Sequence, residues 1–183
     1  PSSRRRPHRL LASGCADIIA NYTAILDWEL SHRLRGGEPL SEYALTLSRM
    51  TAEILFKNAD LIKPHSEESA WLVTKALVSS GVAMSIAGSS RPGSGGEHKF
   101  SHALEQLAPG EGGSTGEKCG IGGDHHDVPP RRGTGRGIRD SLKTIGAPTT
   151  PPPRSGSTTR RRLRRCSPHG RSGRNGSPSW IWD

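Results

Sequence analysis

Apolar residues recur at intervals of three and four along the first part of the chain, the spacing that places them on one face of an α-helix. The first such run spans residues 16–35 and ends at Gly36 and Gly37. Asp17 lies in its first turn, where a carboxylate caps a helix and complements its dipole. The apolar positions of the run are Ile18, Ile19, Tyr22, Ile25, Leu26 and Leu30.

The same period continues over residues 40–63 and 66–87, and each of these stretches opens near a serine suited to cap a helix. Trp71 and Met84 are predicted to be core residues of the latter stretch. A helical pattern returns at residues 137–145. Because no alternating strand pattern and no glycine-rich dinucleotide loop after a strand is found, the sequence predicts an all-α domain.

Composition divides the 183 residues, of which only 31% are hydrophobic, into unlike parts. Residues 151–183 contain eight arginines and one acid, while the rest of the chain has 18 basic and 16 acidic residues, so the net charge of +9 describes mainly the tail. We expect a disordered basic arm (1–9), a helical domain (10–150) that is irregular over 111–136, and a disordered tail rich in Arg, Pro, Gly and Ser (151–183).

The tail leaves an alternative function open. Its arginines would bind polyanions without sequence preference and lose that binding in salt. The chain could therefore be a basic nucleic-acid-binding protein that acts through residues 151–183. Trp180 and Trp182 are too few for a base-stacking platform, and the nearly neutral remainder argues against binding by the helical part.

Cysteine usage points to a reducing compartment. Cys15, Cys119 and Cys166 show no paired spacing, which argues against a disulfide framework and a zinc ribbon. No apolar run approaches the length that crosses a bilayer, and no signal peptide is recognisable. We therefore expect a cytoplasmic protein without a membrane segment. Because the chain begins at Pro1 and not at Met, we expect a fragment or a processed piece.

Candidate chemistry gathers in residues 79–107, where a loop of glycine and serine precedes a helix that carries His98 and His102. At this i,i+4 spacing both imidazoles leave the same face of the helix. A small-residue loop also offers helix-start N–H groups to an anion. With the adjacent Glu97, these features suggest a site for a metal and a phosphorylated small molecule. A solvated or hydrogen-bonded histidine pair is the alternative that the spacing leaves open.

The stretch AMSIAGSSRPGSGGEHKFSHALEQLAPG resembles the archaeal sn-glycerol-1-phosphate dehydrogenases. These enzymes belong to the superfamily of dehydroquinate synthase, glycerol dehydrogenase and the iron-containing alcohol dehydrogenases. The resemblance covers residues 10–107 and returns at 116–122 (GEKCGIG) and 137–150 (GIRDSLKTIGAPTT). It implies the helical, metal-binding C-terminal domain of such an enzyme, without the α/β nucleotide-binding domain that precedes it in the family.

The resemblance also implies the site residues. Asp17, in the segment GCADII, and His98 match metal ligands of the family. A third ligand, a histidine in a later L-H-G-E segment, is replaced here by Thr115. Asp17 and His102 match positions that contact substrate, and His102 would be the catalytic residue of a proton relay. A neutral hydroxyl is a poor ligand for Zn²⁺, so we expect weak metal binding.

The implied reaction is the reduction of dihydroxyacetone phosphate to sn-glycerol 1-phosphate for archaeal membrane phospholipid synthesis. Zn²⁺ would polarise the ketone, and NADP or NAD would be bound mainly by the absent domain. The resemblance further implies a homo-oligomeric full-length enzyme. We expect this chain to be inactive by itself, because it lacks both a nucleotide domain and a complete metal site.

Residues 123–127 (GDHHD) have the composition of a metal cluster, but adjacent residues seldom converge on one ion and the family has no counterpart. We hypothesise instead that residues 111–136 and 151–183 are read out of frame. Residues 113–116 can be encoded by DNA whose neighbouring frame contains Leu-His-Gly.

Overall fold

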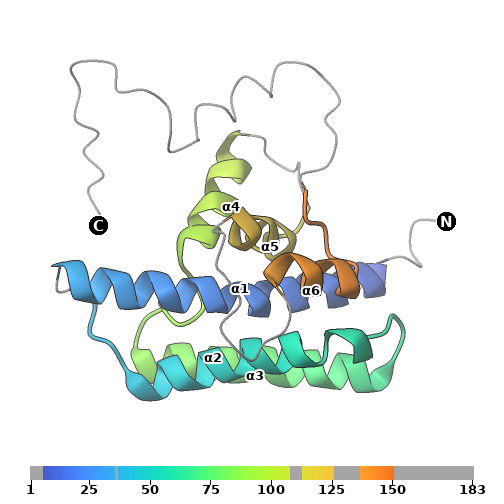
Figure 1. Cartoon of the computed structure of the whole chain (residues 1–183), viewed down its shortest axis with the longest axis horizontal. Helices are drawn as coiled ribbons and strands as arrows, with labels where there is room; N and C mark the ends of the chain where they lie inside the picture. The colour runs from blue at the N-terminus through green and yellow to red at the C-terminus, as the bar shows by residue number, and fades with distance from the viewer. Residues whose placement is uncertain (1–5, 36, 108–112, 126–136, 151–183) are drawn as a thin grey trace. The chain divides into compact units, whose positions relative to one another are not determined.

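The computed structural model describes residues 6–35, 37–107, 113–125 and 137–150, all within one compact unit, Pro1–Pro151. Every regular element in these ranges is helical and none is a strand, which confirms the predicted all-α fold class. The elements are α1 (Arg6–Arg35), α2 (Glu42–Lys57), the 3₁₀ turn η2 (Ala59–Leu61), α3 (Glu67–Ala87), α4 (Gly96–Leu107), α5 (Thr115–His125) and α6 (Ile138–Ile145) (Figure 1).

Helix α1 is the central element of the unit. With 30 residues it is about 45 Å long. Helices α2 and α3 pack on one side of it, and α4, α5 and α6 pack on the other (Figure 1). The main hydrophobic core lies between these layers and includes Ile18, Ile19, Tyr22, Leu55, Phe56, Val73, Leu142 and Ile145. Each of these helices contacts α1, and α6 also contacts η2.

Helix α1 begins ten residues earlier than predicted, so the interpretation of Asp17 as a first-turn cap is wrong. The preceding residues are helical because they have tertiary partners. The guanidinium of Arg9 donates to both carboxylate oxygens of Glu117 on α5, at 2.7 and 2.9 Å. Residues 6–9 of the predicted disordered arm are thus helical, while residues 1–5 lie outside the described ranges.

Helices α2 and α3 begin close to their predicted starts. Ser41 and Ser66 are their N-caps, and their hydroxyls accept from the N–H groups of Ala44 and Ser69 at 3.3 and 3.2 Å. Helix α2 ends six residues before the predicted position. Helix α3 ends at Gly88, whose φ of 67° is the left-handed conformation that favours glycine after a helix.

Helix α3 has an exposed apolar face. Trp71 is 58% exposed, so its prediction as a core residue is wrong; its ring lies 5.3 Å from the ammonium of Lys75. Apolar residues occur on all sides of α3, so their period does not indicate which side is buried. The other large apolar side chains that are exposed on this helix are Leu77, Val78, Val82 and Ile86.

Within the described ranges, α3 is also the single helix that is long and apolar enough to cross a membrane, with 21 residues and a mean hydropathy of 1.4. The expectation that no run has this length is corrected accordingly. One such helix is weak evidence for a span, because core helices have the same length and composition. One side of α3 packs against α2 and α1.

Helix α5 lies within residues 111–136, for which an irregular chain was predicted, and that prediction is wrong for this helix. Four of its eleven residues are glycines, each of which costs a helix about 1 kcal/mol relative to alanine. Here the glycines allow close packing. A Cβ on Gly116 would overlap the carbonyl oxygen of Ser13, and one on Gly120 would lie 3.0 Å from Cβ of Ala16. Tertiary contact with α1 thus offsets the poor intrinsic helix propensity.

Ion pairs join α5 to three different helices. The buried ends of these pairs need partners, because an unpaired charge in a protein interior is strongly destabilising. Each pair therefore resists displacement of α5 in a different direction. The pairs are Glu117 with Arg9 of α1, Lys118 with Glu105 of α4, and Asp124 with Arg139 of α6.

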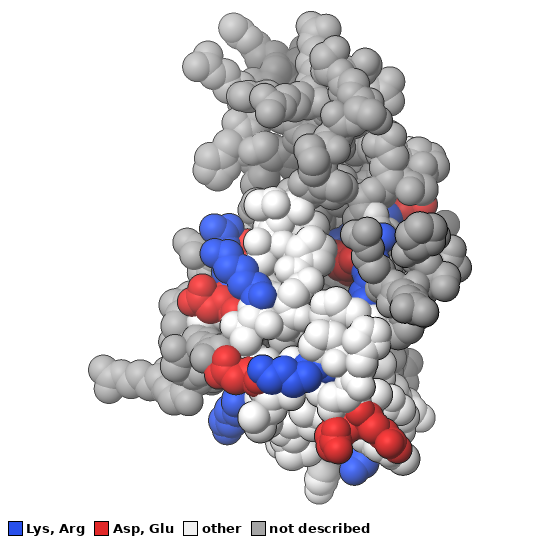
Figure 2. Space-filling model, turned by 90° about the vertical axis from the view of Figure 1, so that its right-hand side faces the viewer, with Lys and Arg blue, Asp and Glu red and all other residues white. Residues whose placement is uncertain are grey.

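Charge is balanced over the part of the chain that the structure describes, which has 13 Lys and Arg and 14 Asp and Glu. Figure 2 shows basic and acidic side chains interspersed on one face, with uncharged surface between them. This distribution does not form the basic stripe typical of a nucleic-acid-binding surface. The tail on which the nucleic-acid alternative depends lies outside the described ranges.

We expect Gly116→Ala to lower the free energy of unfolding by about 2 kcal/mol or more, because the new methyl group meets backbone and not a flexible side chain. Gly81→Ala in α3 is the matched control. A Cβ at Gly81 would have nothing within 4 Å, so this change should be neutral or stabilise by up to about 1 kcal/mol. Urea denaturation followed by circular dichroism measures both; equal midpoints would contradict the close packing of α5.

Candidate metal centre

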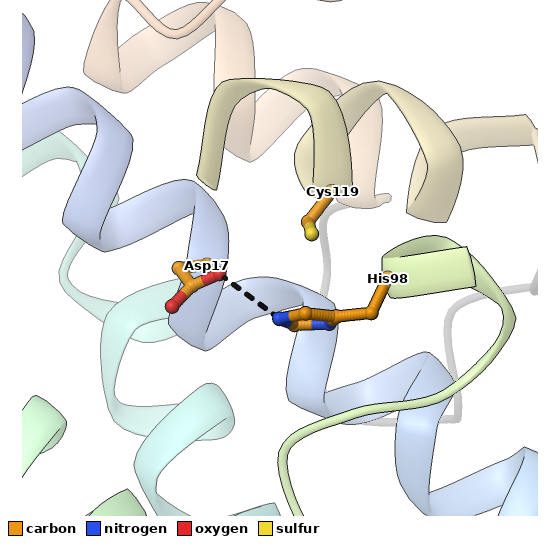
Figure 3. A group of neighbouring side chains, drawn as sticks. All are labelled: Asp17, His98 and Cys119. Atoms are coloured by element: carbon orange, nitrogen blue, oxygen red, sulfur yellow. Dashed lines mark ion pairs between the residues drawn. The ribbon is translucent and has the colours of Figure 1, made fainter. Parts of the chain in front are cut away.

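Three helices that are distant in sequence bring three potential metal ligands together. Asp17 lies on α1, His98 on α4 and Cys119 on α5, and their ligand atoms all lie within 4.8 Å of one another (Figure 3). Nε2 of His98 is 3.7 Å from Oδ1 of Asp17. The Cys119 side chain is fully buried, while the other two are partly exposed. The cluster therefore has a buried side on α5 and an accessible side.

The orientation of His98 is fixed by Glu97, which is 0% exposed. Oε1 of Glu97 lies 3.1 Å from Nδ1 of His98 and accepts the N–H of Gly95 at 2.6 Å. Oε2 accepts from the Thr23 hydroxyl of α1 at 3.1 Å. An Nδ1–H that donates to this carboxylate leaves Nε2 as the ring nitrogen with a lone pair, on the side of Asp17.

The ionisable groups of this cluster shift one another's pKa values. The hydrogen bond to Glu97 raises the pKa of His98, against burial and with the support of the Asp17 charge. Burial raises the pKa of Asp17, which the His98 charge partly counteracts. Burial opposes ionisation of Glu97, but hydrogen bonds from His98 and Gly95 outweigh it and lower the pKa. Burial, with the nearby carboxylates, raises the pKa of the Cys119 thiol. In the absence of a metal, the protonated imidazole is thus favoured between two carboxylates.

Two N–H groups at the start of α4, where the sequence suggested an anion site, already donate to carboxylates of the protein. Gly95 donates to Glu97, and Gly96 donates to Oδ2 of Asp27 on α1 at 2.6 Å. The guanidinium of Arg91 is paired with Glu38 at 3.2 Å. Carboxylates of the protein thus occupy the start of α4, and the loop serves to fix this helix on α1.

Named proteins are closely similar to this chain over most of its length. It is 86% identical over 145 residues to the glycerol-1-phosphate dehydrogenase (NAD(P)+) of Methanoculleus marisnigri and 74% identical over 145 residues to that of Methanosphaerula palustris. It is 58% identical over 146 residues to that of Methanothermobacter thermautotrophicus. The matched residues make up 79–80% of this chain.

Over these residues the chain belongs to the glycerol-1-phosphate dehydrogenase family. This confirms the resemblance found in the sequence. The chain spans only 39–41% of the length of the three relatives. No family model matches the chain. The relatives support a dehydrogenase and give no support to the nucleic-acid-binding alternative.

The structure brings together two of the residues that the family resemblance singled out, Asp17 and His98. Thr115, which by the family resemblance stands at the position of a third histidine, is exposed at the start of α5, one turn before Cys119. His102 is exposed on α4, one turn after His98, and forms no hydrogen bond or ion pair with another described residue. Asp124, from the GDHHD segment, is instead held by Arg139.

Sequence reasoning missed the contribution of Cys119 to this cluster and the burial of Glu97. The cysteine could not be assigned from spacing, because its neighbours in the site lie 102 and 21 positions away. One signal was present for the glutamate, since it directly precedes His98 in a stretch already singled out. An acidic residue in the first turn of α4 has, however, the ordinary explanation of a helix-dipole partner.

The residues present fit a divalent metal ion. Oδ1 of Asp17 is buried and has no hydrogen-bond donor, an arrangement that a cation would satisfy. A histidine that donates its other ring N–H to a carboxylate is the usual arrangement of metal-binding imidazoles. Carboxylate oxygen, imidazole nitrogen and cysteine sulfur are all ligands that zinc accepts.

We expect Glu97→Gln to lower the pKa of His98 and to weaken Zn²⁺ binding by about 10–100-fold, the usual effect of losing such an outer partner. In the metal-free chain, the stability from charged His98 is complete below its ordinary pKa of 6.5 and is lost as pH rises through its raised pKa. NMR titration of the imidazole and calorimetry with Zn²⁺ measure the two effects. Glu53→Gln, at a partly exposed position of α2, should change neither. An unaltered His98 titration in Glu97→Gln would contradict the assignment.

Proposed function

We propose that this chain is the metal- and substrate-binding portion of an NAD(P)-dependent sn-glycerol-1-phosphate dehydrogenase. The reaction is the reversible reduction of dihydroxyacetone phosphate to sn-glycerol 1-phosphate, a step toward archaeal membrane phospholipids. The juxtaposition of Asp17 and His98 carries the proposal, because helices far apart in sequence place there two groups that match metal ligands of the family. The names of the relatives support the reaction class.

Each residue has a role that its surroundings support. Asp17 and His98 would hold Zn²⁺, which when bound polarises a ketone oxygen as a Lewis acid. Glu97 keeps the Nδ1 proton of His98 in place, so that Nε2 remains available. Asp17, whose side chain is 36% exposed, would also contact the substrate. His102 lies one turn along α4 from the metal pair and would bind substrate and relay a proton to the forming alcohol.

The nicotinamide cofactor, NADP or NAD, would be bound mainly by a part of the enzyme that this chain does not span. In the described ranges no strand leads into a glycine-rich loop, and the N–H groups of Gly95 and Gly96 at the start of α4 donate to carboxylates of the protein. We further propose that the matched part of the relatives is their C-terminal part. A homo-oligomeric enzyme and a cytoplasmic location remain predictions.

A chimera tests this function. Residues 10–150 of this chain would replace the matched segment of the Methanoculleus marisnigri relative, with Zn²⁺ added. We expect reduction of dihydroxyacetone phosphate with NADPH or NADH that is abolished by chelation and lowered at least about 100-fold in kcat/KM by His98→Ala, because an imidazole ligand is lost. The 183-residue chain by itself should show no turnover.

The matched control is His32→Ala, which removes an exposed histidine of α1 and should leave kcat/KM unchanged. A properly folded chimera whose turnover survives both chelation and His98→Ala would overturn the proposed metal role. Metal-dependent turnover by the chain alone would show that it binds the cofactor without the remaining part of the enzyme.

A further inference from the structure

We propose that Cys119 is a third metal ligand in this chain, binding through its sulfur beside Asp17 and His98. The inference rests on the proposed function, which places the metal at the latter two residues. It goes beyond that function because it assigns a thiolate to a site whose third ligand, by resemblance to the family, would be a histidine at the position of Thr115. It also narrows the class of metal that the site accepts.

The first argument is geometric. Donor atoms of a tetrahedral zinc site lie about 3.5 Å apart, given metal–ligand distances of about 2.0–2.3 Å. Asp17, His98 and Cys119 each offer one ligand atom, and these three atoms already lie within 4.8 Å of one another. Figure 3 shows the Cys119 sulfur on the side of α5 that faces the other two residues. These separations exceed the spacing of donor atoms around a bound zinc ion by at most about 1.3 Å.

The second argument is the rigidity of the segment that carries Cys119. Its chain neighbours Glu117 and Lys118 are both held in ion pairs to other helices, and Gly120 lies against Ala16 of α1. A ligand that is fixed by its supporting structure binds a metal with little loss of conformational entropy. Thr115 differs in that its side chain is exposed, at the first residue of α5.

The third argument compares the two buried cysteines. Cys15 and Cys119 are each 0% exposed. Cys15 lies in the apolar core cluster, where a cysteine acts as a small hydrophobic side chain. Cys119 instead lies near two carboxylates, those of Asp17 and Glu97, and the imidazole of His98. These neighbours include two other groups that can bind a metal, which an apolar core does not offer.

The donor set determines which metals fit. One carboxylate, one thiolate and one neutral imidazole balance the charge of a divalent ion and leave a fourth position for water or a substrate oxygen. A thiolate favours zinc and similar soft or borderline ions, whereas Mg²⁺ prefers oxygen ligands throughout. The site should therefore bind Zn²⁺, Co²⁺ and Cd²⁺ and discriminate against Mg²⁺.

Titration of the full 183-residue chain with Co²⁺ tests the inference directly. A thiolate ligand produces a near-ultraviolet sulfur-to-cobalt charge-transfer band that oxygen and nitrogen ligands do not. The titration uses a Cys166→Ser background, which removes the one cysteine outside the described ranges. We expect one equivalent of Co²⁺ to give the band, Zn²⁺ to displace it, and excess Mg²⁺ to leave it intact. Absence of the band in this chain would overturn the proposal.

Two further variants identify the sulfur. Cys119→Ser should abolish the band and weaken Zn²⁺ binding at least about tenfold, while Asp17 and His98 still bind the metal weakly. Cys15→Ser also places a hydroxyl at a fully buried cysteine position, and it should keep the band. Persistence of the band in Cys119→Ser, or its equal loss in both variants, would overturn the inference. If Cys119→Ser does not fold, two other observations test the inference. These are the band of the parent chain and its retention in Cys15→Ser.

The outcome is independent of the chimera assay. Metal-dependent turnover in the chimera without a charge-transfer band in this chain would leave the proposed function standing and remove Cys119 from the ligand set. A charge-transfer band in this chain without turnover in the chimera would support Cys119 as a ligand and contradict the proposed reaction.

Discussion

The buried carboxylate of Glu97 is the interaction on which the site depends. A carboxylate with no solvent contact stays ionised only if donors replace water, and here they come from α1, from the loop before α4 and from His98. The same group therefore joins two helices and sets the tautomer of a candidate ligand. Loss of one of these donors would make the ionised form of Glu97 less favourable.

Helix α5, which carries Cys119, illustrates how tertiary contacts override intrinsic helix propensity. Helix α5 is a poor helix by composition, since glycines occupy more than a third of it. Its stability comes from backbone approach to α1 and from ion pairs to three helices. The glycines of α5 allow its backbone to approach α1 closely. The ion pairs determine where along its neighbours the helix lies.

Much of the helical layout could be predicted from the sequence, because the period of apolar residues and the serine caps at Ser41 and Ser66 are local signals. The pairing of Asp17 with His98 came from family resemblance, and no periodicity shows it. The early start of α1 and the existence of α5 were missed because both depend on tertiary contacts, of which that of Arg9 with Glu117 is one. A contact between residues 108 positions apart leaves no trace in local patterns.

The length of α1 has a consequence for how this site can vary. Along one helix, Arg9 holds α5, Asp17 faces the candidate metal, Thr23 contacts Glu97 and Asp27 caps α4. The regular geometry of this one helix therefore fixes the positions of these four side chains relative to one another. Inserting a single residue between Asp17 and Thr23 would rotate every later position by about 100° relative to the earlier ones. Such an insertion would separate the metal ligand from the groups that orient its partner, although the length of the helix would hardly change.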